Sequence, residues 1–242
     1  MRRVIILDKK ESPWPAFLQE FFEDTSTEIL ACHDSQSAGQ FLDKKKCDLG
    51  FFDASLFSMA LTQKLKAFSQ SNPEFRMFHL GPLVKGMEPL FAEVFEAPES
   101  LSVFQKRLVP HLVLPEQITI LVVDDEPEIG ALVRDFFENR VHPSFDIDYA
   151  SNGKKGLEAL EKNKYDLMIL DIKMPEMDGR ELYRRVRTRK LEIPVIIFFD
   201  AVTGDEIMEI HQSGRPPIVE KGSCQSAMAE MMPLIKKMVY FG

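Results

Sequence analysis

Residues 118–127 of the chain read ITILVVDDEP, and residues 165–179 read YDLMILDIKMPEMDG. In each stretch a mostly apolar run ends in carboxylates: Asp124 and Asp125 close the first run, and Asp171 closes the second. Apolar runs of this length, bounded by turn-forming residues, are typical of strands buried on both faces of a parallel sheet. Ligands of such sheets bind beyond the carboxyl ends of the strands. The two stretches therefore predict a parallel α/β sheet with an acidic site at one edge.

The acidic edge predicts a magnesium site that also holds a phosphoryl group. Three converging carboxylates repel one another unless a cation lies between them, and oxygen ligands suit Mg²⁺. A further run, RPPIVEKG at 215–222, places Lys221 after another strand. Its ammonium would supply a compact positive charge for phosphate. Asp171 is then the candidate nucleophile, which would form an acyl phosphate.

Taken together, these residues resemble the receiver domain of two-component response regulators. The resemblance covers residues 118–242 and rests on the Asp-Asp pair after the first strand, on LDIKMPEMDG, and on Lys221 after the fifth strand. It implies a flavodoxin-like, doubly wound sheet of five parallel strands in the order 2-1-3-4-5. It also implies that Asp171 accepts a phosphoryl group from a sensor histidine kinase or a histidine phosphotransfer protein, and that Lys221 contacts this group.

The resemblance further implies how Mg²⁺ is held. Asp125, Asp171 and the backbone carbonyl of Lys173 would bind the ion, and Asp124 would help through a water molecule. An alternative interpretation treats the Asp-Asp pair only as helix-capping carboxylates, which are favourable beside a helix N-terminus.

The first half of the chain repeats the second. RRVIILDKKE at 2–11 corresponds to ITILVVDDEP, and KCDLGFFDAS at 46–55 corresponds to KYDLMILDIK at 164–173, which places Asp53 opposite Asp171. The period of about 118 residues is the length of a whole domain and is too long for a solenoid repeat. We therefore predict two such sheets in tandem, a degenerate receiver domain over 1–113 and a receiver domain with the phosphoacceptor site over 118–242.

The hydrophobic pattern predicts alternating strands and helices in both halves, joined by right-handed crossovers. Strands are expected near 3–7, 28–32, 48–52, 75–80 and 92–95, and near 118–123, 145–149, 166–170, 194–199 and 217–220. Helices are expected near 13–23, 35–45, 56–70 and 99–112, and near 127–139, 152–162, 178–189, 204–213 and 223–239. The segment GPLVKGMEPLF at 81–91 is expected to lack its helix, since two prolines and two glycines interrupt the pattern.

The first half has lost part of the predicted chemistry. Lys9 stands in the place of the second aspartate of the pair, and Ala97 stands in the place of Lys221. A divalent ion should bind poorly where a carboxylate is replaced by an ammonium. Asp8 and Asp53 remain without these partners, so we interpret this half as a receiver fold that is not phosphorylated.

The second half departs from its family at the switch positions. Most receivers carry Thr or Ser at the end of the fourth strand, but this sequence reads IPVIIFFDAVTGDE. Depending on the alignment, Phe199 or Asp200 stands there, and neither has a hydroxyl group. The aromatic residue usual in the fifth strand is replaced by Ile218. The usual coupling of a hydroxyl to a rotating aromatic side chain is therefore in doubt.

Composition excludes several classes of partner. The net charge is −8 and the isoelectric point about 5.3, which argues against a nucleic-acid surface. The longest apolar stretch, VIIFF at 195–199, is far too short to cross a membrane. Three cysteines without paired spacing indicate reduced thiols and a cytoplasmic location. No DNA-binding segment is expected after the receiver.

These residues suggest three alternative functions. The first is a response regulator that acts through protein–protein contacts with a downstream partner, with a homodimer left open. The second is a receiver-fold scaffold that no longer uses phosphate. The third, a phosphatase of the haloacid dehalogenase type, would need an acid two residues after the nucleophile, where Lys173 stands. We therefore expect no enzyme activity beyond self-phosphorylation on Asp171.

Overall fold

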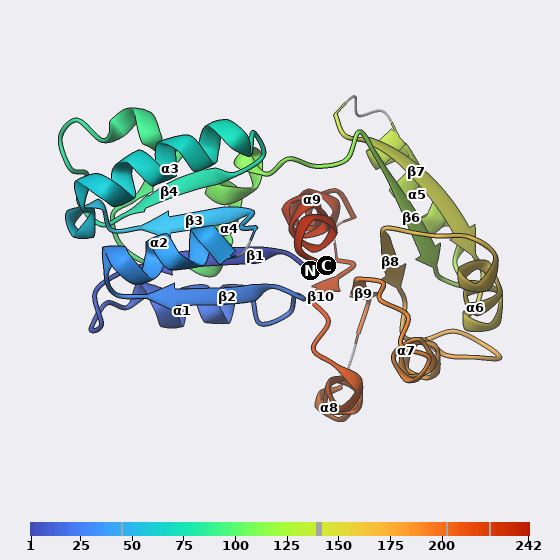
Figure 1. Cartoon of the computed structure of the whole chain (residues 1–242). Coiled ribbons are helices and arrows are strands. Elements are labelled where there is room, and N and C mark those ends of the chain that lie inside the picture. The colour runs from blue at the N-terminus through green and yellow to red at the C-terminus, as the bar shows by residue number, and fades with distance from the viewer. Residues whose placement is uncertain (45, 139–141, 202, 223) are drawn as a thin grey trace. The chain divides into compact units, whose positions relative to one another are not determined.

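The computed structural model describes residues 1–44, 46–138, 142–201, 203–222 and 224–242 (Figure 1). Residues 45, 139 and 223, which bound three of the predicted helices, lie outside this set. The chain divides into two compact units, Met1–Val113 and Leu114–Tyr240, and each unit contains one five-stranded sheet. None of the described helices combines the length and apolar character that crossing a membrane would require.

The sheet of the first unit has the strand order β2-β1-β3-β4-β5, and every pairing is parallel. Its strands are β1 (Arg3–Leu7), β2 (Glu28–Cys32), β3 (Leu49–Phe52), β4 (Arg76–Leu80) and β5 (Glu93–Phe95). Its helices are α1 (Trp14–Phe21), α2 (Ser35–Lys44), α3 (Met59–Ser71) and α4 (Leu101–Leu108). This is the predicted 2-1-3-4-5 order, so the predicted fold of the first half is confirmed.

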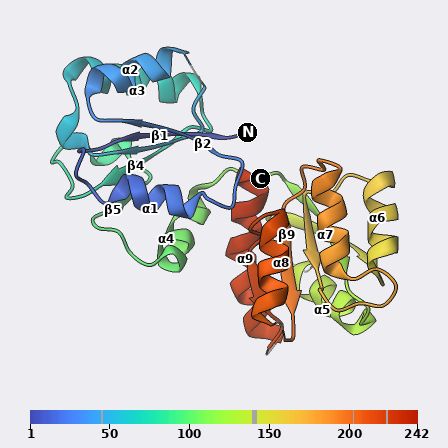
Figure 2. The same ribbon diagram turned by 90° about the horizontal axis from the view of Figure 1, so that it is seen from below.

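Helices cover both faces of this sheet, with α2 and α3 on one face and α1 and α4 on the other (Figure 2). On the second face Phe104 of α4 lies against Phe95 and Phe51, with ring centroids 4.6 and 6.1 Å apart. Phe51 and Phe104 are fully buried, and burying a side chain of this size contributes about 1.5–3 kcal/mol. The apolar runs of the central strands form a core because both of their faces are covered.

The second unit has the same topology, with the order β10-β9-β8-β6-β7 and parallel pairing throughout. Its strands are β6 (Gln117–Val123), β7 (Ser144–Ala150), β8 (Leu167–Leu170), β9 (Val195–Phe199) and β10 (Ile218–Glu220). Its helices are α5 (Pro127–Glu138), α6 (Gly153–Lys162), α7 (Gly179–Thr188), α8 (Gly204–Ser213) and α9 (Cys224–Phe241). One apolar cluster joins the sheet to α5 and α9, and another joins it to α6, α7 and α8.

Local chemistry explains where the helices differ from the predicted ranges. Helix α3 begins at Met59, not near residue 56, because Ser58 caps it by accepting from the backbone N–H of Leu61. Helix α4 ends at Leu108 and gives way to a 3₁₀ turn that contains Pro110. Residues 81–91 are all described and form no α-helix, only a 3₁₀ turn at Glu88–Leu90, as the sequence predicted.

Candidate functional site

Strand register brings the predicted residues of the second unit to one edge of the sheet. The backbone N–H of Asp171 donates to the carbonyl of Val123 at 2.9 Å, which sets the end of β8 beside the end of β6. Asp124 directly follows Val123. The N–H of Lys221 donates to the carbonyl of Phe199 at 2.6 Å, beyond the paired ends of β9 and β10. The site is therefore built from four strand ends that are far apart in sequence.

The Lys221 ammonium lies among the carboxylates of the site. Its Nζ is 3.0 Å from Oδ2 of Asp124 and 3.3 Å from Oδ1 of Asp171. All three residues are buried, so solvent screens these ion pairs weakly. Glu126 and Asp200, both with exposed side chains, lie further out at 3.7 and 3.8 Å from Nζ. Lys221 thus neutralises part of the negative charge that the strands concentrate here.

Three carboxylates are arranged so that they could hold a metal ion. Asp124, Asp125 and Asp171 each offer one oxygen, and these oxygens all lie within 4.8 Å of one another. Hard oxygen donors at this spacing fit Mg²⁺, which usually takes one or two carboxylates and several waters. Asp125 is exposed, so the open side of the group leaves room for water and substrate. The metal role of the Lys173 carbonyl stays a prediction; its N–H donates to Asp171 Oδ2 at 2.9 Å.

Burial shifts the ionisation of the site. It raises the pKa of Asp171 to about 6, with the charge of Lys221 opposing the shift and that of Asp124 adding to it. Burial also raises the pKa of Asp124. For Lys221, burial alone would lower the pKa, but the hydrogen bond and charge of Asp124 and the charge of Asp171 raise it overall. The lysine therefore stays cationic, while Asp171 carries a destabilising negative charge at neutral pH.

The turn after β8 depends on a glycine. Asp178 caps α7 by accepting from the N–H of Glu181 at 2.8 Å, and Gly179 donates its N–H to the carbonyl of Ile172. A β-carbon at Gly179 would overlap the carbonyl oxygen of Asp171. The DG pair of the sequence therefore lets the start of α7 approach the backbone that carries Asp171.

Phe199 and Asp200, the two candidates for the switch position after the fourth strand, have different surroundings in the structure. Phe199 and Ile218 pack against the apolar cluster shared with α7 and α8. Asp200 instead directs its carboxylate to within 3.8 Å of Lys221 Nζ. Thr203 is engaged elsewhere, since it forms a capping box with Glu206 at the start of α8. Of the two alignments, the structure therefore favours Asp200 at the site. Sequence reasoning missed Glu126, although it follows the two aspartates directly.

The corresponding edge of the first unit is built on the same backbone pattern. The N–H of Asp53 donates to the carbonyl of Leu7 at 2.8 Å, as that of Asp171 does to Val123. Strand register also places Ala97 at the level of Lys221. The alignment read from the sequence is therefore also the alignment of the strands.

The chemistry of this first edge differs from that of the second. Nζ of Lys9 forms an ion pair with Asp53 Oδ2 at 3.1 Å. Burial would raise the pKa of Asp53, but hydrogen bonds from Ser55 and the ion pair with Lys9 lower it overall. Asp8, the counterpart of Asp124, is buried. One lysine already compensates the carboxylate that corresponds to the phosphoacceptor, which leaves little attraction for a metal ion.

The second unit is also similar in sequence to known proteins. The family described as the response regulator receiver domain matches residues 120–232. Transcriptional regulatory protein RprY of Bacteroides fragilis is 30% identical over 108 residues, which are 45% of this chain and 44% of that protein. Sensor protein EvgS of Escherichia coli is 30% identical over 100 residues, 41% of this chain and 8% of that protein. The chain thus spans less than half the length of either relative.

Among solved structures, the receiver domain of Francisella response regulator 1452 is 25% identical and has a TM-score of 0.45. The match covers 50% of this chain and 96% of that one. The family match falls within the second unit and includes Asp124, Asp125, Asp171 and Lys221. This span has the sheet order and the acidic edge that the resemblance implied. Residues 120–232 therefore match the response regulator receiver domain family in sequence and also have its expected strand order and acidic edge.

Proposed function

We propose that this chain is a cytoplasmic response regulator of a two-component system that is phosphorylated on Asp171. The observation that carries the proposal is the buried Asp171–Lys221–Asp124 group, with Nζ of Lys221 3.3 and 3.0 Å from the two carboxylates. Asp125 completes a set of three metal-binding oxygens. The phosphoryl donor would be a sensor histidine kinase or a histidine phosphotransfer protein. The phosphorylated chain would act by binding a downstream protein.

In the proposed reaction an Asp171 carboxylate oxygen attacks the phosphorus atom of a phosphohistidine. The new P–O bond forms as the P–N bond breaks, and the histidine nitrogen keeps the electron pair and takes up a proton. Lys221 then turns from Asp171 to the phosphoryl oxygens, whose charge its ammonium stabilises. Mg²⁺ bound by Asp124, Asp125 and Asp171 would neutralise further charge on the phosphoryl group.

The test is intact-protein mass spectrometry after incubation with acetyl phosphate and Mg²⁺. We expect the wild type to gain one phosphoryl group, Asp171→Asn to gain none, and EDTA to prevent the gain. Asp53→Asn is the matched control, since Asp53 has the same backbone position in the first unit but is paired with Lys9. A phosphoryl group that persists in Asp171→Asn and disappears in Asp53→Asn would overturn the assignment of the phosphoacceptor.

A second candidate, a scaffold that does not use phosphate, is favoured by one observation. The carboxylate of Asp200 lies 3.8 Å from Lys221, where a receiver usually has a hydroxyl, and would repel an incoming phosphoryl group. If the wild type gains no phosphate and binds no Mg²⁺, this candidate replaces the first. Its partner contacts would then be the same for the wild type and Asp171→Asn.

Replacing Asp200 with threonine is expected to raise the extent of phosphorylation several-fold. Two unit charges about 4 Å apart repel by about 4 kcal/mol at an effective dielectric of 20, and the exposure of Asp200 reduces this to a fraction. Threonine would remove the charge and add a hydroxyl donor. The measurement is the phosphorylated fraction over time with acetyl phosphate. Asp205→Thr, which removes an exposed charge from α8, is the control. An equal increase in the phosphorylated fraction of Asp205→Thr would show that the effect comes from net charge and not from the site.

A further inference from the structure

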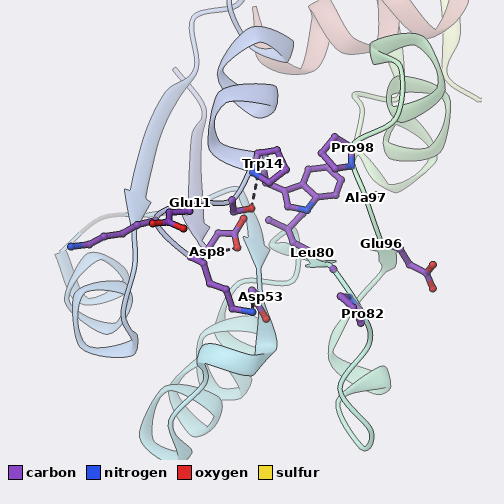
Figure 3. Close-up of a pocket in the computed structure, with 14 residues that line it drawn as sticks. Asp8, Glu11, Trp14, Asp53, Leu80, Pro82, Glu96, Ala97 and Pro98 are labelled. Carbon is purple, nitrogen blue, oxygen red and sulfur yellow. Dashed lines mark hydrogen bonds and ion pairs between the residues drawn. The ribbon is translucent and has the colours of Figure 1, made fainter.

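The first unit contains a pocket at the edge where a receiver would hold its phosphoryl group. The pocket has a volume of about 590 Å³, which is within the range of small-molecule sites. It is lined from the ends of β1, β3, β4 and β5 and from the loop that leads into α1. Figure 3 shows Asp8 and Asp53 on one side of it, with Trp14, Leu80 and Pro98 on the other.

Two changes relative to the second unit open this space. Ala97 stands at the level of Lys221, so a methyl group replaces a long side chain that fills the corresponding site. In addition, α1 begins six positions after Asp8, whereas α5 begins three positions after Asp124. The longer loop, KKESP at 9–13, sets Trp14 against the pocket as an apolar wall. The replacement at Ala97 therefore removes the counterpart of Lys221 and opens part of the pocket at the same time.

The charged groups that line the pocket are mainly carboxylates. Asp8 is only 3% exposed, and its Oδ2 is buried with no hydrogen-bond partner among the described residues. Its Oδ1 accepts from the N–H of Lys9 at 2.7 Å. A buried carboxylate oxygen without a donor is unfavourable, and a ligand that donates to it relieves this cost. Lys9 already pairs with Asp53. The lining carries four carboxylates and two lysines, which are Asp8, Glu11, Asp53, Glu96, Lys9 and Lys10.

We propose that this pocket binds a small organic ammonium ion with an apolar body. The ammonium would donate to the Asp8 carboxylate once the side chain turns its buried Oδ2 toward the pocket, and the apolar body would lie against Trp14, Leu80 and Pro98. A phosphate or carboxylate ligand would be repelled by Asp8 and Asp53. A divalent metal would be repelled by Lys9, and the apolar wall offers it no oxygen. An amine satisfies both the buried acceptor and the apolar lining.

Trp14 makes the proposal directly measurable, since it is the one tryptophan of the chain. The full chain is titrated with phenethylamine, 2-phenylethanol and phenylacetate, which share an aromatic ring and carry a positive, neutral and negative polar end. Binding is followed by Trp14 fluorescence and by saturation-transfer NMR of the probe. We expect saturable binding of phenethylamine, affinity for the alcohol lower by about ten-fold or more, and no binding of the acid.

Substitutions in and outside the pocket test whether phenethylamine binds at Asp8. Asp8→Asn keeps the shape of the side chain and should weaken phenethylamine binding by about ten-fold or more while leaving 2-phenylethanol unchanged. Ala97→Lys should abolish binding of both, because it restores a cationic side chain to the pocket. Glu20→Gln, an equal loss of charge at an exposed position of α1, should change nothing. Equal binding of the amine and the alcohol, or saturable binding of neither, would overturn the proposal. So would a wild-type affinity for the amine in folded Asp8→Asn or Ala97→Lys.

Discussion

Replacing Asp125 with lysine is expected to abolish Mg²⁺ binding by the second unit, with at least a hundred-fold loss of affinity. The change removes one of the three oxygens that lie within 4.8 Å of one another and adds an ammonium to the group. It reproduces the first unit, where Lys9 pairs with Asp53 at 3.1 Å. A single pair of unit charges 4 Å apart is worth about 4 kcal/mol at an effective dielectric of 20, and the substitution changes the charge by two units.

Isothermal titration with MgCl₂ measures this effect without reference to phosphorylation. Glu158→Lys is the matched control, since it makes the same change of charge at an exposed position of α6, and it should retain the wild-type affinity. Asp125→Asn should lie between the wild type and Asp125→Lys, because it removes the charge of the ligand without introducing an opposing one. Unchanged affinity in Asp125→Lys would show that Mg²⁺ binds somewhere other than the acidic edge.

Replacing Asp171 with asparagine is expected to stabilise the second unit when Mg²⁺ is absent. Burial raises the pKa of Asp171 from 3.8 to about 6. Because the folded pKa lies above the unfolded one, the proton on Asp171 adds stability below about pH 4. That stability is lost as the pH rises through about 6. A shift of about two units corresponds to about 3 kcal/mol at neutral pH, and asparagine avoids this cost. Lys221 keeps Asp124 as a partner at 3.0 Å.

The measurement is urea unfolding in EDTA at pH 7 and at pH 4. All four tyrosines lie in the second unit, and the one tryptophan lies in the first, so tyrosine and tryptophan signals follow the two units separately. The increase in the free energy of unfolding caused by Asp171→Asn should appear in the tyrosine signal at pH 7 and vanish at pH 4. Saturating Mg²⁺ should reduce or reverse this difference in stability between Asp171→Asn and the wild type, because the ion binds the folded wild type.

Asp53→Asn provides a control of opposite sign. In the wild type, the hydrogen bonds that Asp53 accepts from Ser55 and its ion pair with Lys9 lower the pKa of Asp53. A lowered carboxyl pKa contributes stability above the unfolded pKa, which is lost as the pH falls through the folded pKa. The asparagine variant should therefore lose stability in the tryptophan signal at pH 7. A loss of stability in Asp171→Asn at the same pH would contradict the view that burial of a charge dominates at the phosphoacceptor.

The sequence by itself determined the two sheets and most of the acidic site. Buried parallel strands carry continuous apolar runs, so stretches such as ITILVV and LMIL mark their own positions and ends. The residue after each run then falls at the carboxyl edge of the sheet, which is why Asp124, Asp171 and Lys221 could be grouped before any distance was known. The comparison of the two halves likewise identified Lys9 and Ala97 as the changed positions.

Only the tertiary structure decided what lies around those residues. Which of Phe199 and Asp200 faces Lys221 depends on the alternation of side chains at the end of β9, and a shift of one residue reverses it. The contact of Glu126 with Lys221 depends on the turn before α5. The unpaired oxygen of Asp8 and the pocket beside Trp14 arise from four strand ends and a longer loop that meet in space. Cavities and unsatisfied atoms are properties of packing among distant segments, so no local pattern in the sequence records them.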